Sequence, residues 1–275
     1  MTLTLHPKTT DTIPIEAEVI RPDLFADKTL DQIGQLTVYQ GNRSRPLCDC
    51  FDIDGDPRDE QIVLEGDFAR VKSVGQSMRR GRITIRGPVG MHLGAEMRGG
   101  QIDVHGDSGD WVGAEMRGGL IRIHGDAGHL VGGSYRGSAS GMKGGVIVVC
   151  GSAGNEIGCG MRRGLIAIAG SVGDFAGFNL IAGTIVVAGS FGIRCGAGMR
   201  RGSIVALGSQ QQHPELLSTF RYDCDYHPQF LAIYLHHLQS SGFTPDATAL
   251  NGRYRRYSGD LVALGKGEIL LRVSS

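Results

Sequence analysis

A motif with the pattern Met-x-x-Gly-x-Ile-x-Val-x-Gly is repeated along the middle of this 275-residue chain and constrains its fold more than any other feature. Successive copies are 19 residues apart, except for one step of 26 residues. The motif begins at Met78, Met97, Met116, Met142, Met161, Leu180 and Met199. Glycines recur in register with these positions over residues 78–208, and chance does not produce such columns. The chain is therefore built by structural repetition in this part.

Each copy contains a short alternating strand such as "IDV" or "IRI", with glycines on both sides that permit turns. A strand of three residues cannot bury its own apolar side chains, but stacking successive copies about 4.8 Å apart does so. The 44 glycines argue against a helical alternative. We therefore predict an all-β fold, a parallel β-solenoid of about seven 19-residue coils that is roughly 30 Å long.

The repeat also predicts which side chains point inward. The columns headed by Met78, Ile83 and Ile85 are apolar in every copy and are predicted to form the core. Two outer columns are polar in the first three coils and apolar in the last four, so the apolar strip needs a cover. Either the C-terminal segment or another subunit supplies it. The predicted interface residues are Val148, Ala167, Val186, Val205 and Leu207.

The position after each motif methionine is basic in six of the seven coils, and some coils add a second arginine. Like charges at coil spacing repel, so an acidic partner surface or a polyanionic ligand is a candidate counterpart. Solvated arginines that support the turns are the alternative. The insertion "SYRGSASG" at 134–141 is a candidate binding loop or ordinary loop variation. The candidate binding residues are Arg79, Arg98, Arg117, Lys143, Arg162, Arg200, Arg201, Tyr135 and Arg136.

Motifs of catalysis and metal binding are missing from the sequence. It contains no G-x-S-x-G elbow, P-loop, H-E-x-x-H or C-x-x-C, so we expect no catalytic residues in this chain. We expect its cysteines to be free thiols. His105, His124 and Cys150 share an outer column, but ladder neighbours point in parallel rather than converging, so we expect no metal site there. A formal net charge of zero gives no argument for nucleic acid or membrane binding. With no signal-like or spanning apolar run, a cytoplasmic protein is expected.

The ends of the chain depart from the repeat. Residues 1–60 are predicted to be an N-terminal lead-in and cap, 61–209 the β-helix, and 210–275 a small C-terminal α/β extension. Within the extension, residues 227–243 are predicted to form a helix, with Pro228 in its first turn and Gly242 after its end. The segment 261–273 is predicted to be a hairpin that turns around residues 265–267.

The Met-x-x-Gly-x-Ile-x-Val-x-Gly coils resemble the GXGXG domain family, over residues about 62–208. That family includes the C-terminal β-helix of glutamate synthase large subunits and the C subunits of formylmethanofuran dehydrogenases. The flanking sequence "RRYSGDLVALGKGEILL" looks most like the C subunits of bacterial formyltransferase/hydrolase complexes. The resemblance implies a right-handed β-helix that serves as a non-catalytic scaffold subunit.

The resemblance further implies one-carbon metabolism linked to formaldehyde oxidation in methylotrophs. In such a complex the formyl group passes from formyl-tetrahydromethanopterin to a methanofuran-type carrier and leaves as formate. The implied partners are an amidohydrolase-like subunit, a formyltransferase subunit and a further subunit, and no cofactor is expected on this chain. The polyglutamyl tail of the carrier is a candidate ligand of the basic corners. Two alternatives remain: the C subunit of a molybdenum or tungsten formylmethanofuran dehydrogenase, and a stand-alone GXGXG subunit of a glutamate-synthase-like system.

Overall fold

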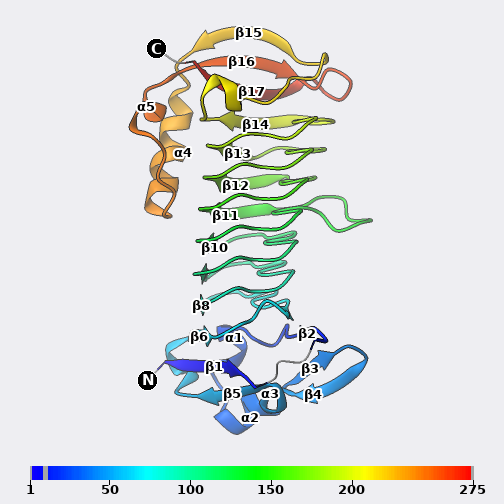
Figure 1. Cartoon of the computed structure of the whole chain (residues 1–275), viewed down its shortest axis with the longest axis vertical. Helices are drawn as coiled ribbons and strands as arrows, with labels where there is room; N and C mark the ends of the chain where they lie inside the picture. The colour runs from blue at the N-terminus through cyan, green and yellow to red at the C-terminus, as the bar shows by residue number, and fades with distance from the viewer. Residues whose placement is uncertain (1, 9–11, 274–275) are drawn as a thin grey trace.

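A stack of parallel strands runs along the long axis of the molecule (Figure 1). The computed structural model describes residues 2–8 and 12–273. Strands predominate over helices in the described structure, and none of the described helices combines the length and apolar character that crossing a membrane requires. The strands of the main sheet are β1 (Leu3–Pro7), β5 (Phe51–Asp54), β6 (Gln61–Glu65), β8 (Arg82–Arg86), β9 (Gln101–Val104), β10 (Leu120–Ile123), β11 (Lys143–Val149), β12 (Arg163–Ile168), β13 (Thr184–Val187), β14 (Arg201–Ala206), β15 (Arg221–Tyr226), β16 (Arg253–Gly259) and β17 (Lys266–Val273).

Strands β8 to β14 pair in parallel in the register that the repeat predicts. Ile83 lies opposite Ile102, and the same column continues through every later coil to Ile204. The column extends beyond the repeat, because Ile62 of β6 precedes it and Ile269 of β17 follows it. These isoleucines and the motif methionines are almost completely buried, so the predicted core columns are confirmed.

A second row of parallel contacts closes the other side of the coils. Single bridges connect Val89, Ser108 and Ala127 of successive coils, and the row continues from Phe68 at one end to Phe191 at the other. Glycine is needed where the chain turns between the two rows. At Gly113, for example, φ is +60° and an added Cβ would lie 2.5 Å from the Cδ1 atom of Ile147.

Residues 2–8 and 12–60 cover the N-terminal end of the stack. Strand β1 pairs in parallel with β6 and antiparallel with β5, so β6 is not an open edge. A four-stranded sheet in the order β4-β3-β2-β7 lies beside it. Its elements and the nearby helices are β2 (Ile15–Glu16), β3 (Thr37–Gln40), β4 (Arg43–Pro46), β7 (Val71–Lys72), α1 (Pro22–Phe25), α2 (Leu30–Gly34), α3 (Leu47–Cys50) and the 3₁₀ helix η1 (Pro57–Asp59).

The C-terminal residues cover the other end. Strand β17 pairs in parallel with β14, and β16 and β15 extend the sheet as antiparallel strands. The remaining elements are the 3₁₀ helix η2 (Gln210–Gln212), α4 (Gln229–Ser240) and α5 (Ala247–Leu250). The hairpin is present, but its first strand is β16 rather than residues 261–264, which form the turn. The sequence misplaced this strand because Leu261, Val262 and Leu264 are apolar, yet all three are exposed in the turn.

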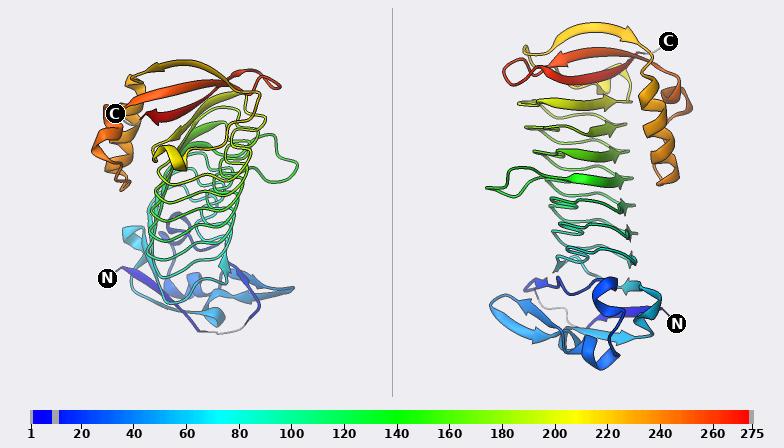
Figure 2. Two further views of the ribbon diagram at one scale, coloured as in Figure 1. Left: turned by 45° about the horizontal axis from the view of Figure 1, so that its top comes forward. Right: turned by 180° about the vertical axis from the view of Figure 1, so that it is seen from behind.

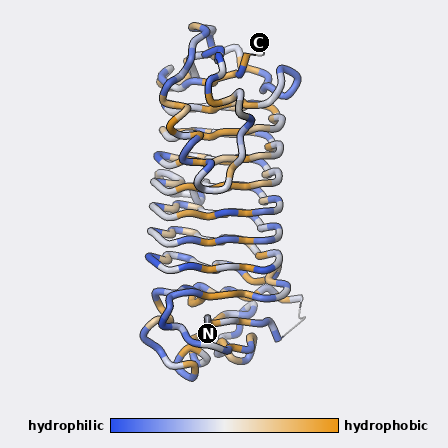
Figure 3. The backbone as a smooth tube through the Cα atoms, turned by 90° about the vertical axis from the view of Figure 1, so that its left-hand side faces the viewer, coloured by the Kyte–Doolittle hydropathy of each residue, from blue (hydrophilic) through white to orange (hydrophobic). Residues whose placement is uncertain are grey.

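Helix α4, predicted at residues 227–243, packs along the outer face of the later coils (Figures 1 and 2). Its buried side chains Leu231, Leu235 and Leu238 belong to one apolar cluster with the outer side chains of those coils. Figure 3 faces this side, where α4 crosses the upper coils and the lower coils show hydrophilic stretches. The cluster contains all five residues that were expected at a subunit interface: Val148, Ala167, Val186, Val205 and Leu207.

The expected subunit interface at these five residues is therefore corrected. They are at most 3% exposed because the chain's own C-terminal helix lies over them. The sequence left open whether the C-terminal segment or another subunit covers the apolar strip, and in the structure the C-terminal segment covers it. A partner subunit can contact α4 on this side, but it does not reach the strip beneath the helix.

Candidate functional site

The basic corner residues form a ladder along one edge of the stack. The backbone N–H of Arg98 donates to the carbonyl of Met78, and that of Arg117 donates to Met97, each at 2.7 Å. Arg200 repeats the contact with Leu180 at 2.7 Å. Burial of the methionine thus places the next side chain at the surface. All of the basic corner side chains are exposed except that of Lys143, which is half-buried.

Only part of this ladder is neutralised within the chain. The Nζ atom of Lys143 lies 3.5 Å from Oε2 of Glu115, and Arg80 contacts Glu60 at 2.7 Å. Among residues 2–8 and 12–273, no carboxylate forms an ion pair with the remaining arginines of the ladder, which are Arg79, Arg98, Arg117, Arg162, Arg163, Arg200 and Arg201. These side chains are therefore available to an external anion.

Four arginines gather in one groove near the C-terminal end of the ladder. Arg162 and Arg163 come from one coil, and Arg200 and Arg201 come from the second coil after it. The groove is open and has a volume of about 350 Å³. We call it the arginine groove. Its two arginine pairs are two coils apart, which corresponds to roughly 10 Å at the spacing of stacked strands.

The floor of the arginine groove is apolar. The intervening coil contributes Ile181 and Ala182, and Leu264 from the turn between β16 and β17 completes the lining. Guanidinium groups recognise carboxylates through paired hydrogen bonds. The groove is therefore suited to a chain with two anionic groups and an uncharged segment between them. The repeat pointed to the arginines, but nothing in the sequence indicated that Leu264 would reach them.

The insertion at residues 134–141 leaves the stack on the side opposite α4 (Figures 1 and 2). Tyr135 does not project freely. Its hydroxyl group lies 3.0 Å from Nδ1 of His92 in a hydrogen bond, and its ring stacks on Trp111 with 5.0 Å between centroids. Burial, followed by Glu96 and Glu115, raises the pKa of Tyr135 to about 12. Arg136, in contrast, is exposed at the tip of the loop.

These two loop residues thus differ as candidate binding residues. Tyr135 anchors the base of the loop, whereas Arg136 is accessible to a ligand or a partner. The adjacent Gly137 has open space around it, since an added Cβ would have no atom within 4 Å. The structure does not bring this loop into the lining of the arginine groove, which the corner residues of later coils form.

Among solved structures, the chain resembles one chain of the formyltransferase/hydrolase complex (FhcABCD) from Methylorubrum extorquens, crystallised in complex with methylofuran. The sequences are 37% identical, the TM-score is 0.89, and the match covers 98% of this chain and 100% of the other. Curated sequence relatives are C subunits of formylmethanofuran dehydrogenases. The chain belongs to this C-subunit family.

The curated relatives match over a shorter part. The C subunit of the molybdenum-containing formylmethanofuran dehydrogenase 1 from Methanothermobacter thermautotrophicus is 48% identical over 95 residues, which are 34% of this chain and 24% of that protein. The C subunit of the tungsten-containing formylmethanofuran dehydrogenase 2 from Methanothermobacter wolfeii is 42% identical over 95 residues, or 33% and 35% of the two chains. The matches thus span about a quarter to a third of these relatives. No protein-family model matches the chain.

Proposed function

We propose that this chain is the non-catalytic scaffold subunit of a multi-subunit formyltransferase/hydrolase complex. The complex transfers a formyl group from formyl-tetrahydromethanopterin to a methanofuran-type carrier and releases it as formate. The observation that carries the proposal is the match to one chain of such a complex over the whole length of that chain, at 37% identity. The catalytic residues belong to the amidohydrolase-like and formyltransferase subunits in this proposal, and this chain holds no reacting group of a cofactor.

The architecture supports a role in holding partners together. The strands of the stack pair edge to edge and both ends are covered, so the molecule is a rigid rod with fixed distances between its surface groups. We infer that its coils form a right-handed β-helix of the GXGXG type, because parallel crossover connections are almost always right-handed. The domain division at residues 60 and 209 and a cytoplasmic location are part of the same proposal.

We propose that the arginine groove binds an acidic chain, and that the polyglutamyl tail of the carrier is this chain. The groove offers two arginine pairs without an ion-pair partner among the described residues and an apolar floor between them. Replacing Arg162 and Arg200 by alanine should weaken carrier binding by at least about tenfold, since each carboxylate loses a charged hydrogen-bond donor worth about 1.5–3 kcal/mol. Arg79→Ala at the far end of the ladder is the matched control.

A second candidate is a molybdenum or tungsten formylmethanofuran dehydrogenase. Within the matched segments of 95 residues, the chain is 48% and 42% identical to C subunits of those enzymes, and this identity favours the second candidate. Metal analysis of the intact complex separates the two candidates. Molybdenum or tungsten in stoichiometric amount would support the dehydrogenase, and its lack together with formate release would support the hydrolytic complex.

Affinity purification of the tagged chain from its native host tests the scaffold proposal. We expect three further subunits to co-purify, including amidohydrolase-like and formyltransferase proteins. Flavin-containing and iron–sulfur amidotransferase chains in their place would favour the glutamate-synthase-like alternative. Purification of the chain alone at every salt concentration would contradict the scaffold role.

A further inference from the structure

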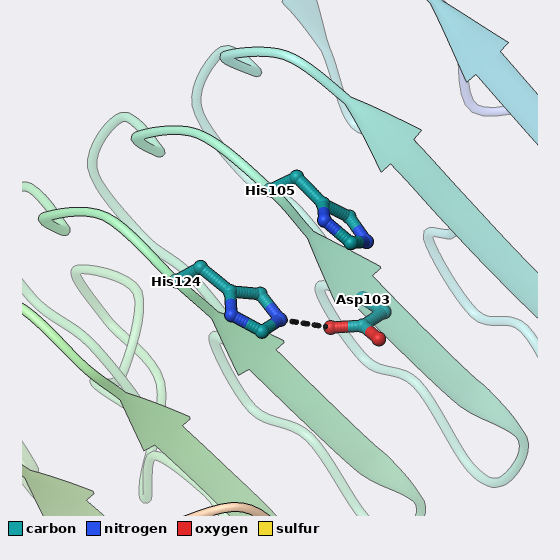
Figure 4. A group of neighbouring side chains, drawn as sticks. All are labelled: Asp103, His105 and His124. Atoms are coloured by element: carbon teal, nitrogen blue, oxygen red, sulfur yellow. Dashed lines mark hydrogen bonds and ion pairs between the residues drawn. The ribbon is translucent and has the colours of Figure 1, made fainter.

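A cluster of potential metal ligands lies on the open part of the outer face, where α4 does not cover the coils. Asp103 lies on β9, and His105 follows the same strand two residues later, so both side chains point outward. His124 occupies the position equivalent to His105 on the next coil. Figure 4 shows the three side chains beside one another on these two neighbouring strands, with His124 directed at the carboxylate of Asp103.

The three side chains are already close to one another. The Nε2 atom of His124 is 2.9 Å from Oδ1 of Asp103, and the two imidazole rings are stacked with 4.9 Å between centroids. One ligand atom from each of the three residues lies within 4.8 Å of the other two. In a tetrahedral zinc site, bonds of about 2.0–2.2 Å separate the ligand atoms by roughly 3.4 Å. Both imidazoles are exposed, so side-chain rotation can bring their nitrogens to this separation.

We propose that Asp103, His105 and His124 bind a divalent transition-metal ion of the zinc class. Two imidazole nitrogens and one carboxylate oxygen are a common ligand set for such ions, and they leave at least one coordination position for water or an incoming ligand. The expectation of no metal site came from the single column of His105, His124 and Cys150. Asp103 stands in the neighbouring outer column and supplies the convergent ligand.

Arg122 lies on the other side of the Asp103 carboxylate from His124 and connects the cluster to helix α4. Its Nη1 atom lies 3.7 Å from Oδ2 of Asp103, and its Nε–H donates to the carbonyl of Ser241 at 2.8 Å. The guanidinium thus contacts one carboxylate oxygen and leaves Oδ1 directed toward His124. Because Ser241 is the C-cap of α4, the site also lies at the end of the helix that covers the later coils.

The test is a titration of the full-length, chelator-treated chain with Zn²⁺, followed by calorimetry, and with Co²⁺, followed by its visible absorption. We expect one ion per chain. His105→Gln is the most informative variant, because it leaves the hydrogen bond between Asp103 and His124 in place. It should nevertheless lower the affinity by at least about tenfold. His124→Gln should have a similar effect, while His236→Gln on the exposed face of α4 is the control and should not change the affinity.

A circular-dichroism spectrum and an unfolding curve identical to those of the wild type show that each variant is folded. Binding of one ion that disappears in both site variants and persists in the control supports the proposal. Binding that is undetectable in the wild type, or that persists in His105→Gln and His124→Gln, overturns it. These results are independent of the arginine groove, because the two sites share no residue and the probe here is the metal ion alone.

Discussion

The outer face of the stack has two halves that share one architecture and differ in what covers them. Around β8 to β10 the outer side chains are polar and partly exposed, as for Thr84, Asp103 and Arg122. Around β11 to β14 they are apolar and lie under α4. The inner isoleucine column continues unchanged through both halves. The repeat therefore determines the stack, and the two outer columns determine which surface the stack presents.

The largest effect is expected from placing a charge under the helix. Val186 is completely buried in the cluster with α4, so Val186→Asp leaves a carboxylate without a partner and should cost about 3–5 kcal/mol. Thr84→Asp is the matched change on the open half, and it should cost only about 1–2 kcal/mol, because the half-exposed carboxylate lies opposite Asp103 but stays hydrated. Urea unfolding of both variants measures the difference. Equal losses would mean that α4 does not protect the later coils.

Truncating the helix itself should have the next largest effect. Leu235 is fully buried against the later coils, and Leu235→Ala should destabilise the protein by about 2–5 kcal/mol. Ile233 is 70% exposed on the same helix, so Ile233→Ala should change stability by less than about 0.5 kcal/mol. Limited proteolysis should cut α4 faster in the first variant only. Similar cleavage of both variants would count against docking of the helix.

The repeat accounts for how far the sequence could predict this fold. The same residues recur at the same positions in every coil, so the strand register is indicated many times. The pairing of Ile83 with Ile102 therefore follows directly from the 19-residue spacing. Outside the repeat that redundancy is lost. Nothing in residues 3–7 indicates that β1 inserts beside β6, and the exposed turn at 261–264 resembled a strand because of its apolar residues.

The candidate sites show the same limit. The basic ladder follows from the repeat, because each arginine stands at a fixed position after a buried methionine. The lining of the arginine groove by Leu264 and the packing of Tyr135 on Trp111 depend on contacts between segments that no common period relates. The convergence of Asp103 on His124 is diagonal between two columns, so an examination of each column separately missed it.

Two glycines compare the packing of the coils with that of the inserted loop, and the expected difference between the two variants is smaller than in the comparisons above. Gly113→Ala places a methyl group 2.5 Å from Ile147 at a φ of +60°, and strain with overpacking should cost about 2–5 kcal/mol. Gly137→Ala meets no atom within 4 Å at a φ of +87°, so only the backbone strain of about 1–2 kcal/mol remains. Thermal unfolding compares them. A larger loss at Gly137 would contradict the described packing of the coils.

The smallest effect is a dependence of stability on pH at the base of the insertion. Burial, followed by the charge of Lys72, lowers the pKa of His92 below its ordinary value of 6.5. The unfolded chain therefore binds a proton more readily than the folded chain, and this stability is present above pH 6.5 and declines as the pH falls below it. His92→Gln should flatten the pH dependence of the unfolding free energy. An unchanged slope would show that His92 is not desolvated by Tyr135 and Trp111.

The scaffold role is tested most directly by assaying the complex with and without this chain. Formate release from formyl-tetrahydromethanopterin should be measured with the remaining subunits alone, with this chain alone, and with all subunits reconstituted. We expect no activity for the chain alone, incomplete assembly with strongly reduced formate release when the chain is missing, and recovery when it is added back. Formate release by the isolated chain, or full activity and assembly without it, would contradict the scaffold role.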